Sequence, residues 1–239
     1  MPGYWVTLAD LARLRDTVDQ EEGAAMSAAE RTADLADVES VVRTIATVAV
    51  GNEKFFGDLD AVVGDGDFGY SMARGFELVL GGWDDFDRTD IGTFLKKIAV
   101  VITSRIGGTS GPIWGTAFLR AGTAAGTATT LDPDPVIAML RAAIAGIKAR
   151  GKSDVGDKTL LDALVPAVDV LEERLKDGAT AAEAIGTAAR TARERAEATR
   201  EMLAKRRRAA YTGERSIGTL DAGAVAIARD VRGARTAVG

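Results

Sequence analysis

The chain has 239 residues, of which 46% are hydrophobic and 5% aromatic, and 30 Lys and Arg face 35 Asp and Glu for a formal net charge of −5. It contains no cysteine and no histidine, which excludes disulfides, thiolate metal sites and a Ser-His-Asp triad. The acidic balance argues against nucleic acid as a partner, and the lack of a basic-then-apolar leader or a long apolar run argues against export and membrane spanning, so we expect a cytoplasmic protein.

Apolar residues at alternating steps of three and four predict a series of amphipathic helices. Residues 1–36 carry only a weak pattern and are predicted to be an N-terminal arm, which leaves 37–239 as the main domain. A long helix is expected from Val41 to about Val62. Further helices are expected from about Ser71, over 94–102, 113–123, 136–147, 161–175, 181–196 and 222–231. Glycine and proline separate them and no alternating strand pattern appears, so the sequence predicts an all-α bundle or closed ring of about seven to nine helices.

The strongest local feature is the set of three aspartates Asp60, Asp65 and Asp67, with glycines at 64, 66 and 69. Asp60 falls in the last turn of the long helix, so the two glycine-flanked aspartates of the following loop can turn back toward it. Three carboxylates this close repel one another unless a hard cation neutralises them, and oxygen ligands suit Mg²⁺ together with phosphate oxygens. The alternative is a solvated acidic turn, and the spacing does not match an EF-hand calcium loop.

Two further segments have chemistry that suits a phosphate compound. The turn 107–112 (GGTSGP) can offer amides and hydroxyls to a phosphate or ribose at a helix N-terminus, or can serve only to join two helices. The run 205–208 (KRRR) places four cations at a helix end, where most are expected to be solvated and one can reach a phosphate. Phosphoryl transfer depends mainly on positioning and charge neutralisation, so a carboxylate-held metal and one arginine suffice without histidine. Neither a Walker A pattern nor a strand-borne GxGxxG is present.

Taken in order, these segments resemble the L subunit, the nucleotide-binding domain, of the dihydroxyacetone kinases. The matching stretches are 59–76, 107–120, 156–167 and 209–224, within a resemblance that covers about 40–235. The family fold is a barrel of amphipathic antiparallel helices with the nucleotide site at one end. The resemblance therefore implies a phosphotransferase subunit that passes a phosphoryl group from Mg²⁺-bound ADP/ATP to the alcohol group of a short-chain ketose, which a separate K subunit holds.

The resemblance also assigns individual residues. Asp60, Asp65 and Asp67 would be the metal ligands, and Arg208 would face the phosphates as the catalytic group. Thr109 and Ser110 would lie on the phosphate and ribose side, Gly151 and Leu160 would line the adenine pocket, and Asp221 would close the site. The complete set expected at the nucleotide is Phe68, Gly69, Tyr70, Ser71, Thr109, Ser110, Gly151, Leu160, Arg208 and Asp221.

Three positions depart from the family pattern: Phe68 stands for the usual histidine, Ser71 for asparagine and Ala222 for proline. They leave two alternatives open, a catalytically impaired regulatory or adaptor subunit and a kinase subunit for a related sugar such as erythrulose. A fatty-acid-kinase-like domain shares the three aspartates, but the segments at 107–112 and 213–216 favour the ketose kinases. Besides the K subunit, a phosphotransferase-system subunit is a candidate partner, and we expect a homodimer with neither nucleic acid nor membrane as a partner.

Overall fold

The computed structural model describes residues 32–206 and 213–238, and in that part the chain is almost entirely helical. Its helices and strands are β1 (Ala33–Asp34), α2 (Leu35–Gly51), α3 (Glu53–Ala61), α4 (Asp67–Gly81), η1 (Trp83–Asp85), α5 (Ile91–Arg105), α6 (Ser110–Ala125), β2 (Thr130–Leu131), α7 (Pro133–Gly151), α8 (Leu161–Lys176), α9 (Ala181–Ala198), η2 (Thr199–Glu201), η3 (Gly213–Ser216) and α11 (Ala222–Val238). The all-α prediction is confirmed. Within the described ranges, none of these helices has the length and apolar character that crossing a bilayer requires.

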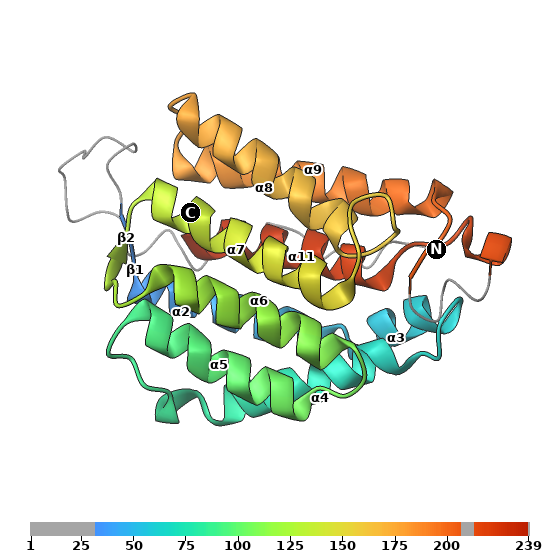
Figure 1. Cartoon of the computed structure of the whole chain (residues 1–239), viewed down its shortest axis with the longest axis horizontal. Coiled ribbons are helices and arrows are strands. Elements are labelled where there is room, and N and C mark those ends of the chain that lie inside the picture. Colours follow the sequence, from blue (N-terminus) through green and yellow to red (C-terminus); the bar gives the residue numbers. More distant parts are fainter. Residues whose placement is uncertain (1–31, 207–212, 239) are drawn as a thin grey trace, which may run out of the picture. The chain divides into compact units, whose positions relative to one another are not determined.

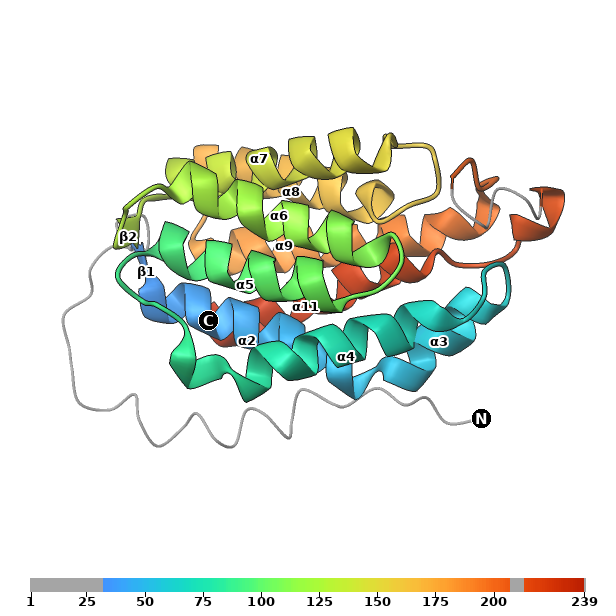
Figure 2. The same ribbon diagram turned by 60° about the horizontal axis from the view of Figure 1, so that its bottom comes forward.

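Eight of the described helices form a closed ring in which neighbours run antiparallel (Figures 1 and 2). The order around the ring is α2, α4, α5, α6, α7, α8, α9 and α11, and α11 packs against α2 to complete it. The short α3 follows α2 and packs on α4. Because neighbours alternate in direction, α4, α6, α8 and α11 all begin at the same end of the ring, on the right in Figure 1. This end is called the α4/α6/α8/α11 end below.

The interior of the ring is filled differently on its two sides. Between α4 and α6, the ring of Phe76 packs edge-on against Trp114 and Phe118, with centroids 6.5 and 6.4 Å apart. On the opposite side, α9 buries an alanine at every fourth position: Ala184, Ala188, Ala192 and Ala196. Small side chains let helix backbones approach closely, and α9 packs against both α8 and α11. The alanines of α9 therefore allow close packing on both sides of this helix.

The single long helix expected from Val41 to Val62 is wrong, because the chain breaks at Asn52 between α2 and α3. Both the backbone N–H and the side-chain Nδ2 of Asn52 donate to the carbonyl of Val48, at 3.1 and 2.8 Å. An asparagine side chain that competes for a helix carbonyl favours a break. Arg229 of α11 also donates to Asn52 Oδ1, which holds the break in place.

The two short strands were not predicted either. Ala33 pairs with Leu131 and Asp34 with Thr130 in an antiparallel bridge. Two residues a side are too few to show an alternating pattern in the sequence. The boundary predicted between residues 36 and 37 falls in the first turn of α2, and residues 1–31 of the predicted arm lie outside the described residues, so the domain division stays a prediction.

An ion-pair cluster joins α7 to α8 around Glu172. Its carboxylate pairs with Arg141 of α7 and with Lys176 of α8. Hydrogen bonds from Lys176 and Arg141 lower the pKa of Glu172 from 4.5 to about 2. Because the pKa in the folded state lies below the ordinary value, the stabilisation is complete above pH 4.5 and is lost as the pH falls through about 2.

We expect Glu172→Gln to lower Tm near neutral pH, and the gap to the wild type to close as the pH falls from about 4.5 to about 2. Thermal melts across this range give the measurement. Glu173→Gln, at the exposed neighbouring position, is the matched control and should show little gap at any pH. A gap that persists unchanged to the acid end would contradict the assignment.

Candidate functional site

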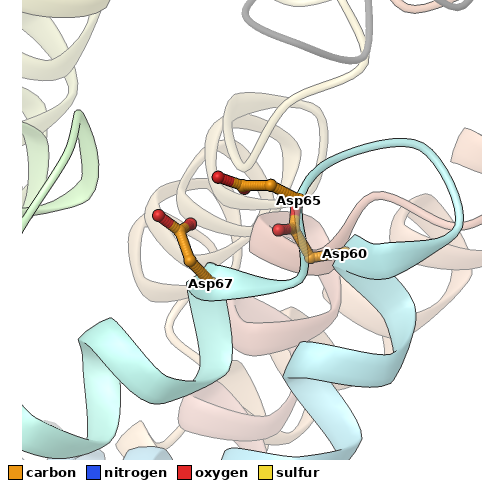
Figure 3. A group of neighbouring side chains, drawn as sticks. All are labelled: Asp60, Asp65 and Asp67. Atoms are coloured by element: carbon orange, nitrogen blue, oxygen red, sulfur yellow. The ribbon is translucent and has the colours of Figure 1, made fainter.

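The three predicted metal ligands lie together where α3 leads into α4 (Figure 3). Asp60 is in the last turn of α3, Asp65 is in the loop and Asp67 is the first residue of α4. Each offers a carboxylate oxygen, and these oxygens all lie within 4.8 Å of one another. Asp60 is half-buried, whereas Asp65 and Asp67 are exposed. The loop thus brings the three carboxylates together as the sequence predicts.

Two glycines allow this loop to turn back onto Asp60. Gly66 has a φ of 77°, a left-handed conformation that favours glycine, and its N–H donates to Asp60 Oδ2 at 2.9 Å. A methyl group on Gly64 would lie 2.5 Å from Asp60 Oδ1, so only glycine fits beside the carboxylate. The N–H of Gly64 also donates to the Asp60 carbonyl at 2.6 Å. The loop backbone therefore binds Oδ2 of the Asp60 carboxylate and the main-chain carbonyl of Asp60.

The carboxylate cluster fits a magnesium ion. It offers only oxygen ligands, and it is open to solvent at Asp65 and Asp67, which leaves positions for water and phosphate oxygens. The positive end of the α4 dipole near Asp67 offsets only part of the repulsion among three carboxylates. A divalent cation would provide the charge that balances the rest.

Phe68 faces the interior of the protein. Its side chain is 7% exposed, and its ring lies 5.9 Å from that of Phe56 in α3, centroid to centroid. Phe68, Met72 and Phe76 recur at every fourth position of α4 and are all buried, so they form one apolar stripe. Phe68 therefore packs on α3, and its expected contact with the nucleotide stays a prediction.

Gly69 likewise marks a contact between two helices. A methyl group there would lie 2.0 Å from the carbonyl oxygen of Glu53 and 2.5 Å from the backbone nitrogen of Gly57, both in α3. No flexible side chain is available to move aside, because both neighbours are backbone atoms. Gly69 therefore sets the distance between the helices that carry the aspartates, and its expected contact with the nucleotide stays a prediction.

Gly69→Ala is expected to destabilise the protein by roughly 1–3 kcal/mol, because the added methyl must push α3 away from α4. The same movement would separate Asp60 from Asp67 and reduce the rise in Tm on adding Mg²⁺ and ADP. Gly81→Ala is the matched control in the same helix, since nothing lies within 4 Å of a methyl there. Thermal melts with and without Mg²⁺ and ADP test this, and a wild-type Tm for Gly69→Ala would contradict it.

Tyr70 and Ser71 follow in α4. Tyr70 lies toward solvent, and Ser71 lies toward the turn 107–112, called the glycine turn. Tyr70 is 60% exposed, and the guanidinium of Arg74 stands 5.5 Å from its ring centroid. Ser71 is half-buried. A methyl on Gly107 would lie 4.0 Å from Ser71 Oγ, so Ser71 is next to the turn between α5 and α6. The beginning of α4 and the glycine turn are therefore neighbours.

The glycine turn ends at the first residues of α6. Thr109 is exposed and precedes the helix, Ser110 is its half-buried first residue, and the Thr109 side chain makes no capping hydrogen bond. The first amides of a helix have no partner within the helix, and the dipole there favours an anion. The start of α6 can therefore bind a phosphate group through its backbone.

The remaining described candidates lie around the α4/α6/α8/α11 end. A methyl on Gly151, the last residue of α7, would lie 3.5 Å from Cδ1 of Ile113 in the first turn of α6. Leu160 is buried just before α8, and a methyl on Gly223 would lie 3.2 Å from Leu160 Cβ and 3.1 Å from Asp221 Oδ1. Asp221 Oδ1 also accepts a backbone N–H in the first turn of α11, at 2.7 Å. Figures 1 and 2 show these segments at one end of the ring.

Arg208, the predicted catalytic group, lies outside the described residues. The structure adds a buried charged cluster, to which the sequence analysis gave no role, formed by Asp157 and Lys158 of the α7–α8 loop and Asp162 at the start of α8, at 8%, 4% and 5% exposure. Asp162 accepts two backbone N–H groups of the preceding loop, at 2.6 and 2.7 Å. The sequence pattern that could have identified these residues is three charged residues within six positions that lead into an apolar helix. Charged side chains are seldom buried unless they are paired.

Comparison with known proteins places this arrangement in context. Residues 62–236 match the family described as the DAK2 domain. The chain is 37% identical over 169 residues to the PEP-dependent dihydroxyacetone kinase, ADP-binding subunit DhaL, of Escherichia coli (strain K12), covering 71% of this chain and 80% of that one. It is 36% identical over 215 residues to the L-erythrulose 1-kinase of Mycolicibacterium smegmatis, covering 89% of this chain and 37% of that one.

A solved structure shares the fold. The crystal structure of the dihydroxyacetone kinase from C. freundii in complex with AMP-PNP and Mg2+ matches with a TM-score of 0.66 and 25% sequence identity, covering 89% of this chain and 36% of that chain. The chain thus spans 80% of a separate DhaL subunit and only 36 to 37% of the longer kinases.

Proposed function

This chain belongs to the DAK2 domain family, and from that premise we propose that it is the nucleotide-binding subunit of a dihydroxyacetone-type kinase. It is a phosphotransferase whose acceptor is the alcohol group of a short-chain ketose. The observation that carries the proposal is the convergence of Asp60, Asp65 and Asp67 at the end of the ring where four helices begin. That end combines ligands for Mg²⁺ with helix amides and dipoles that favour phosphate.

Each group of residues has a proposed role that follows from its position. The three carboxylates hold Mg²⁺, which when bound neutralises charge on the phosphate oxygens. The first amides of α6, with Thr109 and Ser110, bind the phosphate and ribose side of the nucleotide, and Arg208 neutralises charge on the transferred group. The other proposed contacts are Tyr70, Ser71, Gly151, Leu160 and Asp221. Phe68 and Gly69 support the site from behind by packing α4 on α3.

The proposed acceptor sits on a separate K subunit. The chain matches most of the length of a separate ADP-binding subunit from E. coli, which is named as PEP-dependent. A phosphotransferase-system protein that rephosphorylates a held ADP is therefore one donor, and ATP is the other. The similarity to an L-erythrulose 1-kinase supports erythrulose as a second candidate ketose beside dihydroxyacetone. We further propose a cytoplasmic location and a homodimer.

The test is single-turnover phosphoryl transfer by the full chain together with a K subunit. Dihydroxyacetone and erythrulose are compared as acceptors, and ATP is compared with ADP plus the phosphotransferase-system donor, each with and without Mg²⁺. We expect Mg²⁺-dependent ADP binding by calorimetry and transfer from one of the two donors. Binding without transfer from either donor would favour the adaptor alternative, and no Mg²⁺-dependent binding would refute the site itself.

A further inference from the structure

Lys158 is a buried cation that the carboxylate site does not use. Its side chain is 4% exposed, and its φ of 60° is a left-handed conformation that few non-glycine residues adopt. Its ammonium donates to the carbonyl oxygens of Met202 (3.1 Å), Ser216 and Thr219 (2.8 Å). An ammonium has three N–H donors, so these three carbonyls can accept all of them. The buried charge is therefore solvated by backbone oxygens.

These carbonyls come from both sides of residues 207–212, one from before them and two from after. The hydroxyl of Ser216 adds a second link between the two sides. It accepts the N–H of Ala204 at 3.0 Å and donates to the carbonyl of Gly213 at 2.8 Å, and Ser216 is 0% exposed. Two buried side chains thus join the chain segment that ends at 206 to the segment that begins at 213.

Asp157, next to Lys158, binds the end of the segment that stops at residue 206. Its carboxylate accepts Nε of Arg206 at 2.8 Å, and its carbonyl accepts the N–H of Lys205 at 3.2 Å. Burial acts to raise the pKa of Asp157, but hydrogen bonds from Arg206 and from the Asp154 N–H lower it below the ordinary value. The carboxylate therefore stays charged at neutral pH. The Asp157–Lys158 pair contacts both segments that border residues 207–212.

We propose that Lys158 is a positioning residue for phosphoryl transfer. It fixes the chain on both sides of residues 207–212, and it holds Thr219, which precedes Asp221 by two residues. The inference rests on the proposed function, in which Arg208 and Asp221 meet the nucleotide. Lys158 acts through these residues, because its own donors are occupied by backbone carbonyls. A displacement of about 1 Å in a reacting site can lower the rate about 100-fold. Nucleotide affinity depends less on Lys158, since the carboxylates and the α6 amides also bind the nucleotide.

The test is Lys158→Met in the full chain with its K subunit, because methionine keeps the apolar stem and removes the donors. We expect the single-turnover rate to fall about 10- to 100-fold, while the Kd for ADP in Mg²⁺ changes less than about 3-fold. Ser216→Ala, a smaller change that breaks only the second link, should lower the rate in the same direction. An unchanged rate in Lys158→Met, or a rate and an affinity that fall by the same factor, would overturn the inference.

Arg141→Met is the matched control, because it removes a cation that pairs with Asp169 and Glu172 between α7 and α8. It should lower Tm and leave the rate intact. Tryptic cleavage after Lys205 and Arg206 gives a measurement that needs no transfer, and it should be faster in Lys158→Met than in Arg141→Met. If the wild type transfers nothing, the proposed function fails, and equal cleavage rates in the two variants would separately overturn the role of Lys158.

Discussion

Asparagine in place of Asp65 is expected to weaken Mg²⁺-dependent ADP binding by at least about 100-fold. At metal sites, the loss of a residue that only hydrogen-bonds to a ligand already lowers metal affinity or activity about 10- to 100-fold. The substitution removes one of three charges whose oxygens lie within 4.8 Å of one another. Asp65 is exposed, so the change of one side-chain atom leaves the packing of α3 on α4 intact. Calorimetry with ADP in the presence and absence of Mg²⁺ gives the measurement.

Asp58→Asn is the matched control for this variant. Asp58 is an exposed aspartate in α3 that pairs with Lys54 and is not one of the three clustered aspartates. Its replacement should leave unchanged both the ADP affinity in Mg²⁺ and the rise of Tm on adding Mg²⁺ and ADP. ADP affinity in Mg²⁺ that is the same for Asp65→Asn and the wild type would show that the carboxylate cluster does not hold the metal.

Arg208→Ala is expected to lower the rate of phosphoryl transfer by about 1000-fold or more, because a phosphate-clamping arginine neutralises charge that develops in the transition state. ADP affinity should change much less, since Arg208 acts on the transferred group. The measurement is single-turnover transfer to a ketose on the K subunit, with calorimetry on the same sample.

Arg207→Ala removes the same charge one position earlier and is the control for the net charge of the run 205–208. It should keep a rate close to that of the wild type. Equal rates for Arg208→Ala and the wild type would show that the phosphates lie elsewhere, and equal losses in both arginine variants would show that only the total charge of the run matters.

Most of the fold could be predicted because each ring helix buries one face. The stripes at steps of three and four place the helices correctly, and the alanines of α9 indicate its close neighbours. The break at Asn52 could not be predicted from periodicity, and Arg229, which holds it in place, is 177 positions away. The stripe continues across the break, so the pattern alone favours one long helix.

The site shows the same division between local and distant causes. Asp60, Asp65 and Asp67 are close in sequence, and the glycines between them permit only a short turn, so their convergence could be predicted. The family resemblance assigns Phe68 to the nucleotide because it stands where the family has histidine, whereas its side chain follows the buried stripe of α4. Lys158 was missed because its three carbonyl partners are 44 to 61 positions away.

The antiparallel ring sorts the connections of the chain into two sets. Every predicted metal or nucleotide contact in the described residues lies at or near the α3–α4, α5–α6 and α7–α8 connections or the stretch before α11. The beginning of α2 and the end of α11 lie at the other end of the ring (Figures 1 and 2). A 17-residue helix such as α2 is about 25 Å long. A domain fused at either boundary of the ring and acting on the carboxylates therefore needs a tether of at least roughly eight extended residues, whereas a separate subunit can approach them directly.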